Sequence, residues 1–240
     1  YCEAVGCNTV QSGVATVHVF RNYYSKASAT DFNDVATWGV NTDGTGTAPS
    51  AIDNTGAFII QNNSQLDLSG NATVRALTIN AGKLTVNSNA LTVSILNQNN
   101  TELNVTNGGT LEITGGSVIV NGAAYFANGS GLTQSGGLLV LFPNSGTAAT
   151  SVGGASGTNI TFGIGYTTAS ATSAISTSAN ALKFNCTGGT IQIVDPTLSS
   201  NSNTVCFAYN GASGVYVNFG ENHTVKLGNG TSTLSGGHAN

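Results

Sequence analysis

The feature that most constrains this chain is a short apolar pattern that recurs through its middle. Triplets of an apolar, a variable and an apolar residue alternate with segments rich in Asn, Gly and Ser. Between residues 76 and 142 these triplets begin at Leu77, Leu84, Leu91, Leu103, Leu111, Val118 and Leu138. Side chains alternate between the two faces of a strand, so each triplet directs two apolar groups to one face. The pattern predicts many short strands, each buried on one side.

The spacing of the triplets predicts how these strands are arranged. The starts at 77, 84 and 91 are separated by seven, and those at 118 and 138 by 20. Units of seven grouped in sets of twenty predict an all-β fold, a right-handed parallel β-helix or three-sided β-solenoid, whose coils stack about 4.8 Å apart. The similarity of 84–93 to 111–120, at an offset of 27, is interpreted as one coil plus one side. The alternative is an antiparallel β-sandwich, which usually has longer strands.

Regularity divides the chain into three parts. Residues 28–145 are the predicted solenoid, and 146–240 are its predicted continuation, with a Gly/Ser/Thr-rich excursion before the triplets resume at Leu182. Residues 1–27 are predicted to be an N-terminal cap or the end of a preceding module, with Phe32 and Trp38 helping to cover the open end. Asn-Gly and Gly-Gly pairs supply the tight turns between sides, and buried Asn side chains are expected to form ladders with their counterparts in the next coil.

Four cysteines form two local pairs, Cys2 with Cys7 and Cys186 with Cys206. In a chain with so few charges they are predicted to form disulfides rather than a metal site, although four cysteines allow three pairings. The positions of Cys186 and Cys206 differ by 20, which equals the predicted coil length and would place one above the other in neighbouring coils. Oxidised cysteines imply an extracellular or cell-surface location.

Charge and hydropathy exclude several classes of partner. Six Lys and Arg stand against ten Asp and Glu, giving a net charge of -4, and no two basic residues are neighbours, so nucleic acid is not an expected partner. No apolar run is long enough to span a membrane, and the first residues do not resemble a signal peptide. We therefore expect a mature chain, or a piece of a longer one, with no membrane span.

Residues capable of catalysis are scattered. Single carboxylates at Asp67, Glu102, Glu112, Asp195 and Glu221 are interpreted as solvated outward charges, and His18, His223 and His238 are far apart. Asn41 to Gly44 is interpreted as a plain turn rather than a Ca²⁺ loop, so no metal and no cofactor are predicted. Thr78, Thr85 and Thr92 would fall on successive sides, which disfavours a threonine array for ice binding. Tyr125, Tyr166, Tyr209 and Tyr216 are candidates for sugar stacking, although packing roles are favoured.

The segment that leads into the first triplets resembles a known family. Asp31 to Trp38 is followed by Pro49, Asp53, Phe58-Ile59-Ile60 and then Leu77-Thr78-Ile79-Asn80-Ala81-Gly82-Lys83-Leu84-Thr85-Val86. This order resembles the β-helical surface adhesins of Bacteroidota that are exported by type IX secretion, including gliding adhesins, and the likeness covers roughly residues 28 to 145. The resemblance implies a non-enzymatic adhesin segment that meets the secretion machinery during export.

We therefore expect an extracellular structural or adhesive segment of a bacterial cell-surface protein, with surface glycans or solid surfaces as partners. The alternatives are a self-assembling extracellular filament subunit and, less favoured, a polysaccharide-active β-helix enzyme.

Overall fold

The computed structural model describes residues 20–94, 102–121, 124–126, 129–141, 159–163, 173–177, 183–193, 207–210 and 216–227. These residues form β-strands, turns and one short 3-10 helix, η1 (Val35–Thr37). The part of the chain so described contains no α-helix, so the fold is all-β, as the composition of short triplets predicts.

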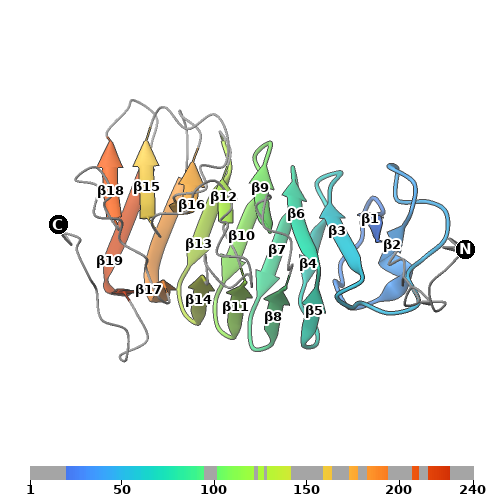
Figure 1. Cartoon of the computed structure of the whole chain (residues 1–240), viewed down its shortest axis with the longest axis horizontal. Helices are drawn as coiled ribbons and strands as arrows, with labels where there is room; N and C mark the ends of the chain where they lie inside the picture. Colours follow the sequence, from blue (N-terminus) through green and yellow to red (C-terminus); the bar gives the residue numbers. More distant parts are fainter. Residues whose placement is uncertain are drawn as a thin grey trace, which may run out of the picture.

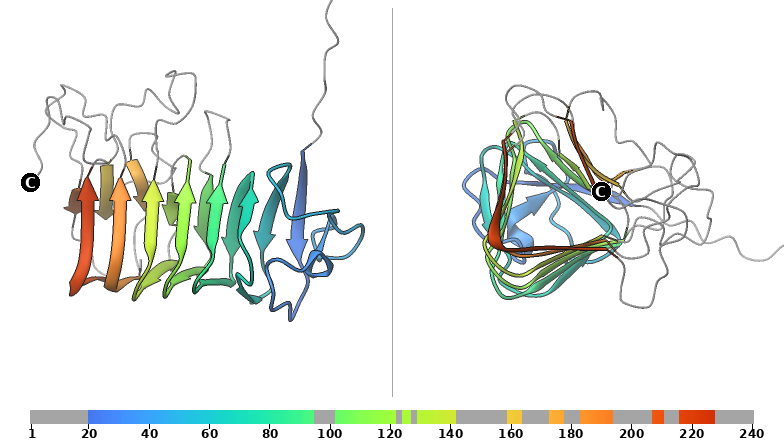
Figure 2. Two further views of the ribbon diagram at one scale, coloured as in Figure 1. Left: turned by 90° about the horizontal axis from the view of Figure 1, so that it is seen from below. Right: turned by 90° about the vertical axis from the view of Figure 1, so that its left-hand side faces the viewer.

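The strands lie in three rows along the long axis of the molecule (Figure 1). Row 1 consists of β1 (Arg21–Ser25), β3 (Gly56–Ile60), β6 (Ala76–Asn80), β9 (Leu103–Thr106), β12 (Ala124–Phe126), β16 (Ser173–Thr177), β15 (Asn159–Gly163) and β18 (Phe207–Asn210). Row 2 consists of β4 (Gln65–Asp67), β7 (Lys83–Val86), β10 (Thr110–Ile113), β13 (Gly131–Gln134) and the first halves of β17 (Lys183–Ile193) and β19 (Tyr216–Leu227). Row 3 consists of β5 (Ala72–Val74), β8 (Ala90–Val93), β11 (Ser117–Val120), β14 (Leu138–Leu141) and the second halves of β17 and β19. Seen end-on, the rows surround one interior (Figure 2).

Pairing along each row is parallel. Row 1 and β2 (Trp38–Gly39) form a nine-stranded sheet. Rows 2 and 3 form one ten-stranded sheet, because the long strand β17 pairs with β13 at its start and with β14 at its end. Among the described strands only β1 and β2 pair in the antiparallel sense. The antiparallel sandwich, our alternative prediction, is therefore not the observed arrangement.

The triplets build the core as predicted. Leu77 and Ile79 of β6 are fully buried and face inward, while Thr78 between them is half-exposed. The same alternation holds in β8, β9, β10 and β11. Inward residues at matching positions lie side by side in successive strands, so Leu84, Leu111 and Leu132 form one continuous apolar stack. Each apolar residue is thus covered by two neighbours of its own kind, which removes most of its surface from water.

The register corrects one part of the sequence interpretation. Leu111 pairs with Leu84, so the offset of 27 is one complete circuit and not a circuit plus a side. The extra length lies between β8 and β9, which are separated by residues 94–102, whereas β11 and β12 are separated by 121–123. Other circuits are shorter, since Leu77 pairs with Phe58 at an offset of 19 and Leu132 pairs with Leu111 at an offset of 21.

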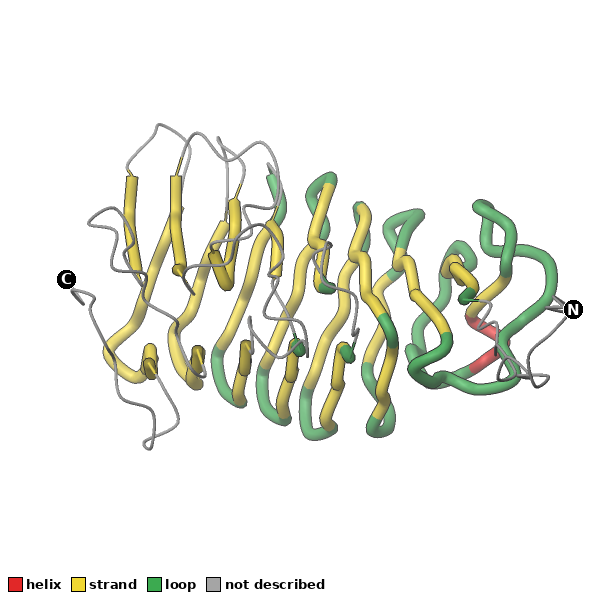
Figure 3. The backbone as a smooth tube through the Cα atoms, viewed as in Figure 1, coloured by secondary structure: helices red, strands yellow, loops and turns green. Residues whose placement is uncertain are grey.

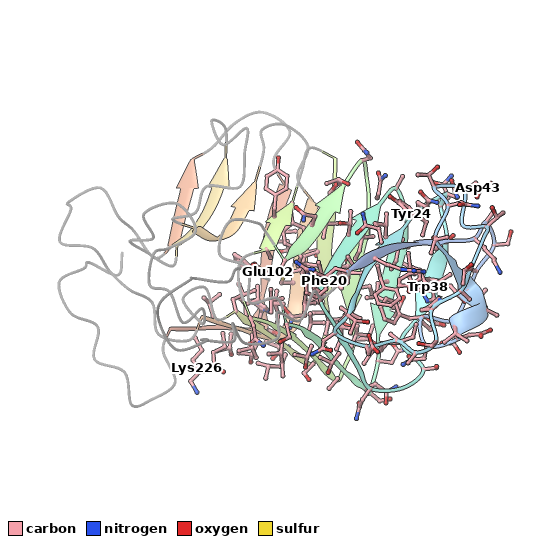
Figure 4. All side chains as sticks on the ribbon, turned by 45° about the vertical axis from the view of Figure 1, so that its right-hand side comes forward. Phe20, Tyr24, Trp38, Asp43, Glu102 and Lys226 are labelled. Atoms are coloured by element: carbon pink, nitrogen blue, oxygen red, sulfur yellow. The ribbon has the colours of Figure 1, made fainter. Side chains whose placement is uncertain are left out.

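An aromatic cluster fills the N-terminal end of the interior. Trp38 and Phe32 are fully buried, with ring centroids 5.2 Å apart, and Trp38 lies 4.9 Å from the ring of Phe58. The indole Nε1 of Trp38 donates a hydrogen bond to the carbonyl oxygen of Phe32 at 3.0 Å, which satisfies its buried polar atom. Figure 4 shows Trp38 within this end and Asp43 on its outer tip. Phe32 and Trp38 therefore fill the end of the core.

The backbone edges at the same end are also covered. The short strand β2 pairs with the outer edge of β1. The amide of Phe32 donates to the carbonyl of Asp67 on β4, and Asn33 accepts from the amide of Gly70 through its side chain. Because β1 is itself the first strand of row 1, the predicted boundary at residue 27 falls directly after a strand of the same sheet.

Candidate functional site

The corner between rows 1 and 2 is built from stacked tight turns. These turns lie at 61–64, 81–82 and 107–109, and they follow one another along the axis as loops between the strands (Figure 3). The amide of Asn63 donates to the carbonyl of Ala81 at 2.9 Å, and the amide of Ala81 donates to the carbonyl of Thr106 at 3.1 Å. Asn63, Ala81 and Asn107 adopt positive φ angles of 55°, 52° and 51°, so the chain bends from row 1 into row 2 within very few residues. The stacked turns therefore form a regular edge along the axis of the molecule.

An open depression of about 230 Å³ lies along this edge. Its lining comes from three successive circuits, each of which contributes turn residues and the first outward residue of the row 2 strand. The lining residues are Asn63 and Gln65, then Ala81, Gly82 and Lys83, then Asn107, Gly108 and Thr110. Gln65, Lys83 and Thr110 occupy equivalent positions in the register of β4, β7 and β10. The site therefore repeats with the strand spacing of about 4.8 Å, or about 10 Å across the three circuits.

One ion pair borders the depression. The ammonium group of Lys83 donates to Oε2 of Glu112 at 2.9 Å, and the hydroxyl of Thr85 donates to the same oxygen at 3.1 Å. The hydrogen bond from Lys83 lowers the pKa of Glu112, with a smaller contribution from the Thr85 hydroxyl. Glu112 is thus held as a carboxylate, which suits an ion-pair partner and not a proton donor.

The outward face of row 2 carries further polar side chains along the axis of the molecule. Six polar residues occupy matching positions in successive row 2 strands: Asp67, Thr85, Glu112, Thr133, Asn185 and Asn218. Asn218 donates from Nδ2 to Oδ1 of Asn185 at 2.9 Å, and Asn107 donates to Asn80 at 2.6 Å on the neighbouring corner. Asparagine side chains therefore pair between neighbouring circuits, but at outward positions and not in the interior, where the sequence predicts them.

The other carboxylates predicted to be outward do not all behave alike. Glu102, directly before β9, is only 3% exposed, so the prediction that it is a solvated charge is wrong. Asp67 and Glu221 are exposed, and Asp195 lies outside the described residues. Glu102 precedes a row 1 strand and Glu112 lies on row 2, so these two carboxylates belong to different faces, as their spacing predicts.

The segment from Asn41 to Gly44 forms a turn, in which the amide of Gly44 donates to the carbonyl oxygen of Asn41 at 2.8 Å. Oδ1 of Asp43 accepts from both the amide and the hydroxyl of Thr45, at 2.9 and 2.6 Å. The hydroxyl bond and then the amide bond lower the pKa of Asp43. Within the described segments no group of three or more His, Cys, Asp or Glu side chains is placed to hold a metal ion.

The remaining predicted residues are dispersed. Thr78, Thr85 and Thr92 lie on rows 1, 2 and 3 in turn, as expected from their spacing. Tyr125 is half-buried on the outward side of β12, and the side chains of Tyr166, Tyr209 and Tyr216 lie outside the described part. The Nδ1 atom of His223 is 3.0 Å from the carbonyl oxygen of Gly188, while His18 and His238 also lie outside that part.

Cys186 is fully buried, and burial raises the pKa of its thiol to about 12. Its neighbours in the register are Gln134 on β13 and Phe219 on β19, so the matching position in the next circuit is a phenylalanine. Cys2, Cys7 and Cys206 lie outside the described residues, and the disulfides stay a prediction.

Comparisons with known proteins return no match, whether with family models, with curated proteins or with solved structures. In the part of the chain that the structure describes, no helix has the length and apolar character needed to cross a membrane.

Proposed function

We propose that this chain is an extracellular structural and adhesive segment of a bacterial cell-surface protein, folded as a three-sided right-handed β-solenoid. The observation that carries the proposal is the unbroken parallel register. The inward stack runs from Phe58 through Leu77 to Leu103 in row 1 and from Leu66 to Phe184 in row 2. Such stacking gives a long particle in which each circuit is held by both neighbours, so local opening breaks hydrogen bonds on two sides. A rigid, elongated segment suits the task of holding a contact surface away from a cell.

The outer surface supports the same proposal. Only 7% of the residues are charged, and the outward positions of row 2 carry mainly amides, hydroxyls and a neutralised ion pair. Six Lys and Arg residues in 240 leave few cleavage sites for trypsin-like proteases outside the cell. Amide and hydroxyl groups both donate and accept hydrogen bonds, which favours hydroxylated or hydrated surfaces as partners.

The covered N-terminal end argues against the filament alternative. A subunit that polymerises along its axis needs an open edge at both ends, so that one end can extend the sheets of the next copy. Here β2 occupies the edge of β1, and Phe32 and Trp38 close the core. A second copy would have to displace this cluster before it could pair.

Adhesion under flow tests the proposal. Beads coupled to the intact chain would be placed on glass, on immobilised neutral glucans and on whole bacterial cells, with albumin-coated beads as the control. We expect the protein-coated beads to resist a shear several-fold higher than the control on at least one surface. Detachment at the albumin threshold on every surface would reject adhesion. Shortening of a glucan during incubation with the chain would instead favour the enzyme alternative.

A further inference from the structure

The depression at the corner of rows 1 and 2 has unused hydrogen-bonding capacity. In the described structure the side chains of Asn63, Gln65 and Thr110 make no hydrogen bond to another protein group, although all three line the depression. Asn63 and Gln65 are exposed at the rim, and Thr110 is half-buried. Each amide offers two donors and one acceptor oxygen, and the hydroxyl offers both functions. A ligand rich in hydroxyl groups can pair with these groups without breaking any bond inside the protein.

The charges around the depression disfavour an anionic ligand. Lys83 supplies +1, and the carboxylates of Glu112 and Asp67 on the same face supply -2, so the local sum is -1. The ammonium group of Lys83 is already engaged with Glu112 at 2.9 Å. A sulfated or carboxylated polymer would have to compete with that carboxylate and approach Asp67. A neutral ligand meets neither cost.

The shape of the site favours a polymer. Equivalent residues from three circuits line the depression at a spacing of about 4.8 Å, so the same kind of contact is offered three times along a line. A chain of similar hydroxylated rings can use these contacts in series, whereas a compact ligand can use only one or two. The lining has no aromatic ring, so each contact is weak, and a monovalent dissociation constant of about 1 mM is expected. Multivalent display strengthens such binding.

We propose that this depression, lined by Asn63, Gln65, Lys83, Asn107, Gly108 and Thr110, binds a neutral polysaccharide along the axis of the molecule. The inference rests on the proposed adhesive function and names the ligand class and the site through which adhesion acts.

Gly108 provides a variant that fills the depression. Its φ angle is +81°, a region that Asn tolerates better than other side chains, and a Cβ atom there would meet no atom closer than 4.0 Å. Gly108→Asn should therefore fold and occupy the space of the ligand. Gly129 occupies the equivalent position one circuit on at the same corner, with a φ of +78° and the amide nitrogen of Gly108 as its nearest atom at 3.9 Å, but it does not line the depression, so Gly129→Asn tests whether the effect is confined to the lining. Gln65→Ala removes one contact, and Thr73→Ala is its control on row 3.

The experiment measures retention of the intact chain and these four variants on cross-linked dextran, agarose, mannan and cellulose, with dextran sulfate as the anionic comparison. We expect retention on at least one neutral matrix, a fivefold or greater loss for Gly108→Asn, a two- to fivefold loss for Gln65→Ala, and no change for Gly129→Asn and Thr73→Ala. Circular dichroism would verify the fold of each variant.

Three results would overturn the inference: no retention on any neutral matrix, retention on dextran sulfate alone, or Gly108→Asn binding as well as the original chain. The bead assay separates this failure from failure of the proposed function. Beads that still resist shear while the columns retain nothing would leave adhesion in place and assign it to another surface. Beads that detach with the albumin control would reject both.

Discussion

Replacing Leu111 by alanine tests the stacked core directly. Leu111 is fully buried on β10, between Leu84 on β7 and Leu132 on β13, which are also fully buried. The backbones on both sides are tied by parallel ladders, so the strands cannot close in on the space left by the side chain. Truncation of a leucine at such a site costs about 3 to 5 kcal/mol of unfolding free energy. For a chain of this size each kcal/mol corresponds to about 2 to 4 °C, so the melting temperature should fall by about 6 to 20 °C.

Urea titration followed by far-UV circular dichroism measures this loss, and Thr133→Ala is the control because Thr133 is half-buried on the outward side of β13. The control should cost less than about 1 kcal/mol. The single tryptophan, Trp38, reports separately on the N-terminal end through its fluorescence. Circuits that melt independently should leave the Trp38 transition less shifted than the dichroism transition. Equal losses for Leu111→Ala and Thr133→Ala would refute the stacked core.

Three further predictions concern single side chains. Glu112→Gln should lower the free energy of unfolding at neutral pH by at most about 1 kcal/mol. Because Lys83 lowers the pKa of Glu112 in the folded protein, this difference is present above the usual pKa of a glutamate and vanishes as the pH falls through the folded value. Acid titration of the stability of both proteins measures it. Trp38→Phe should cost about 2 to 4 kcal/mol, measurable by thermal melting, because it removes the Nε1 hydrogen bond to the Phe32 carbonyl and leaves a void in the aromatic cluster. In reduced protein at pH 8, Cys186 should react with iodoacetamide at least 100-fold more slowly when folded than in urea, as mass spectrometry of the labelled peptide would measure.

The strands could be predicted because the signal for them is local. An apolar residue at every second position is enough to identify an inward face, and Leu77, Leu111 and Val118 all lie where that rule places them. The turns could be predicted for a similar reason. At Gly136 the structure adds a cause beyond backbone conformation, since a Cβ there would overlap the carbonyl oxygen of Thr114 in the preceding turn.

The register could not be predicted, because it depends on the lengths of segments that carry no pattern. A repeat of constant length assumes equal connections at every corner, but β17 pairs with β19 at an offset of 33, from Phe184 to Val217. The separation of Cys186 from Cys206 therefore does not correspond to a circuit at that level, and Phe219 stands beside Cys186 instead. β15 and β16 escaped prediction because 144–180 has few large apolar residues.

The depression was also beyond prediction from sequence, because its residues become neighbours only once the register is known. Asn63, Lys83 and Asn107 come from three different circuits, and none belongs to a motif. The signal that could have found them is their shared position, directly before or at the start of a row 2 strand. If the sequence is aligned by its turns rather than by its apolar triplets, the residues that line the depression fall at equivalent positions.

In this stacked arrangement, the inward residues determine the stability of the fold and the outward residues determine the chemistry of the surface. Inward positions are mostly apolar and matched, with Gln134 on β13 as a buried polar exception, whereas outward positions contact solvent, so the faces of one particle can carry different chemistry. Row 2 presents Glu112 and Thr133 outward, whereas the equivalent stretch of row 3 presents the partly exposed Ile119 and Leu138. A substitution outside the core should therefore change binding on one face and leave stability and the other faces unaltered. For this reason Gln65→Ala on row 2 is compared with Thr73→Ala on row 3: a loss confined to the row 2 variant identifies a site, and an equal loss on row 3 identifies a damaged fold.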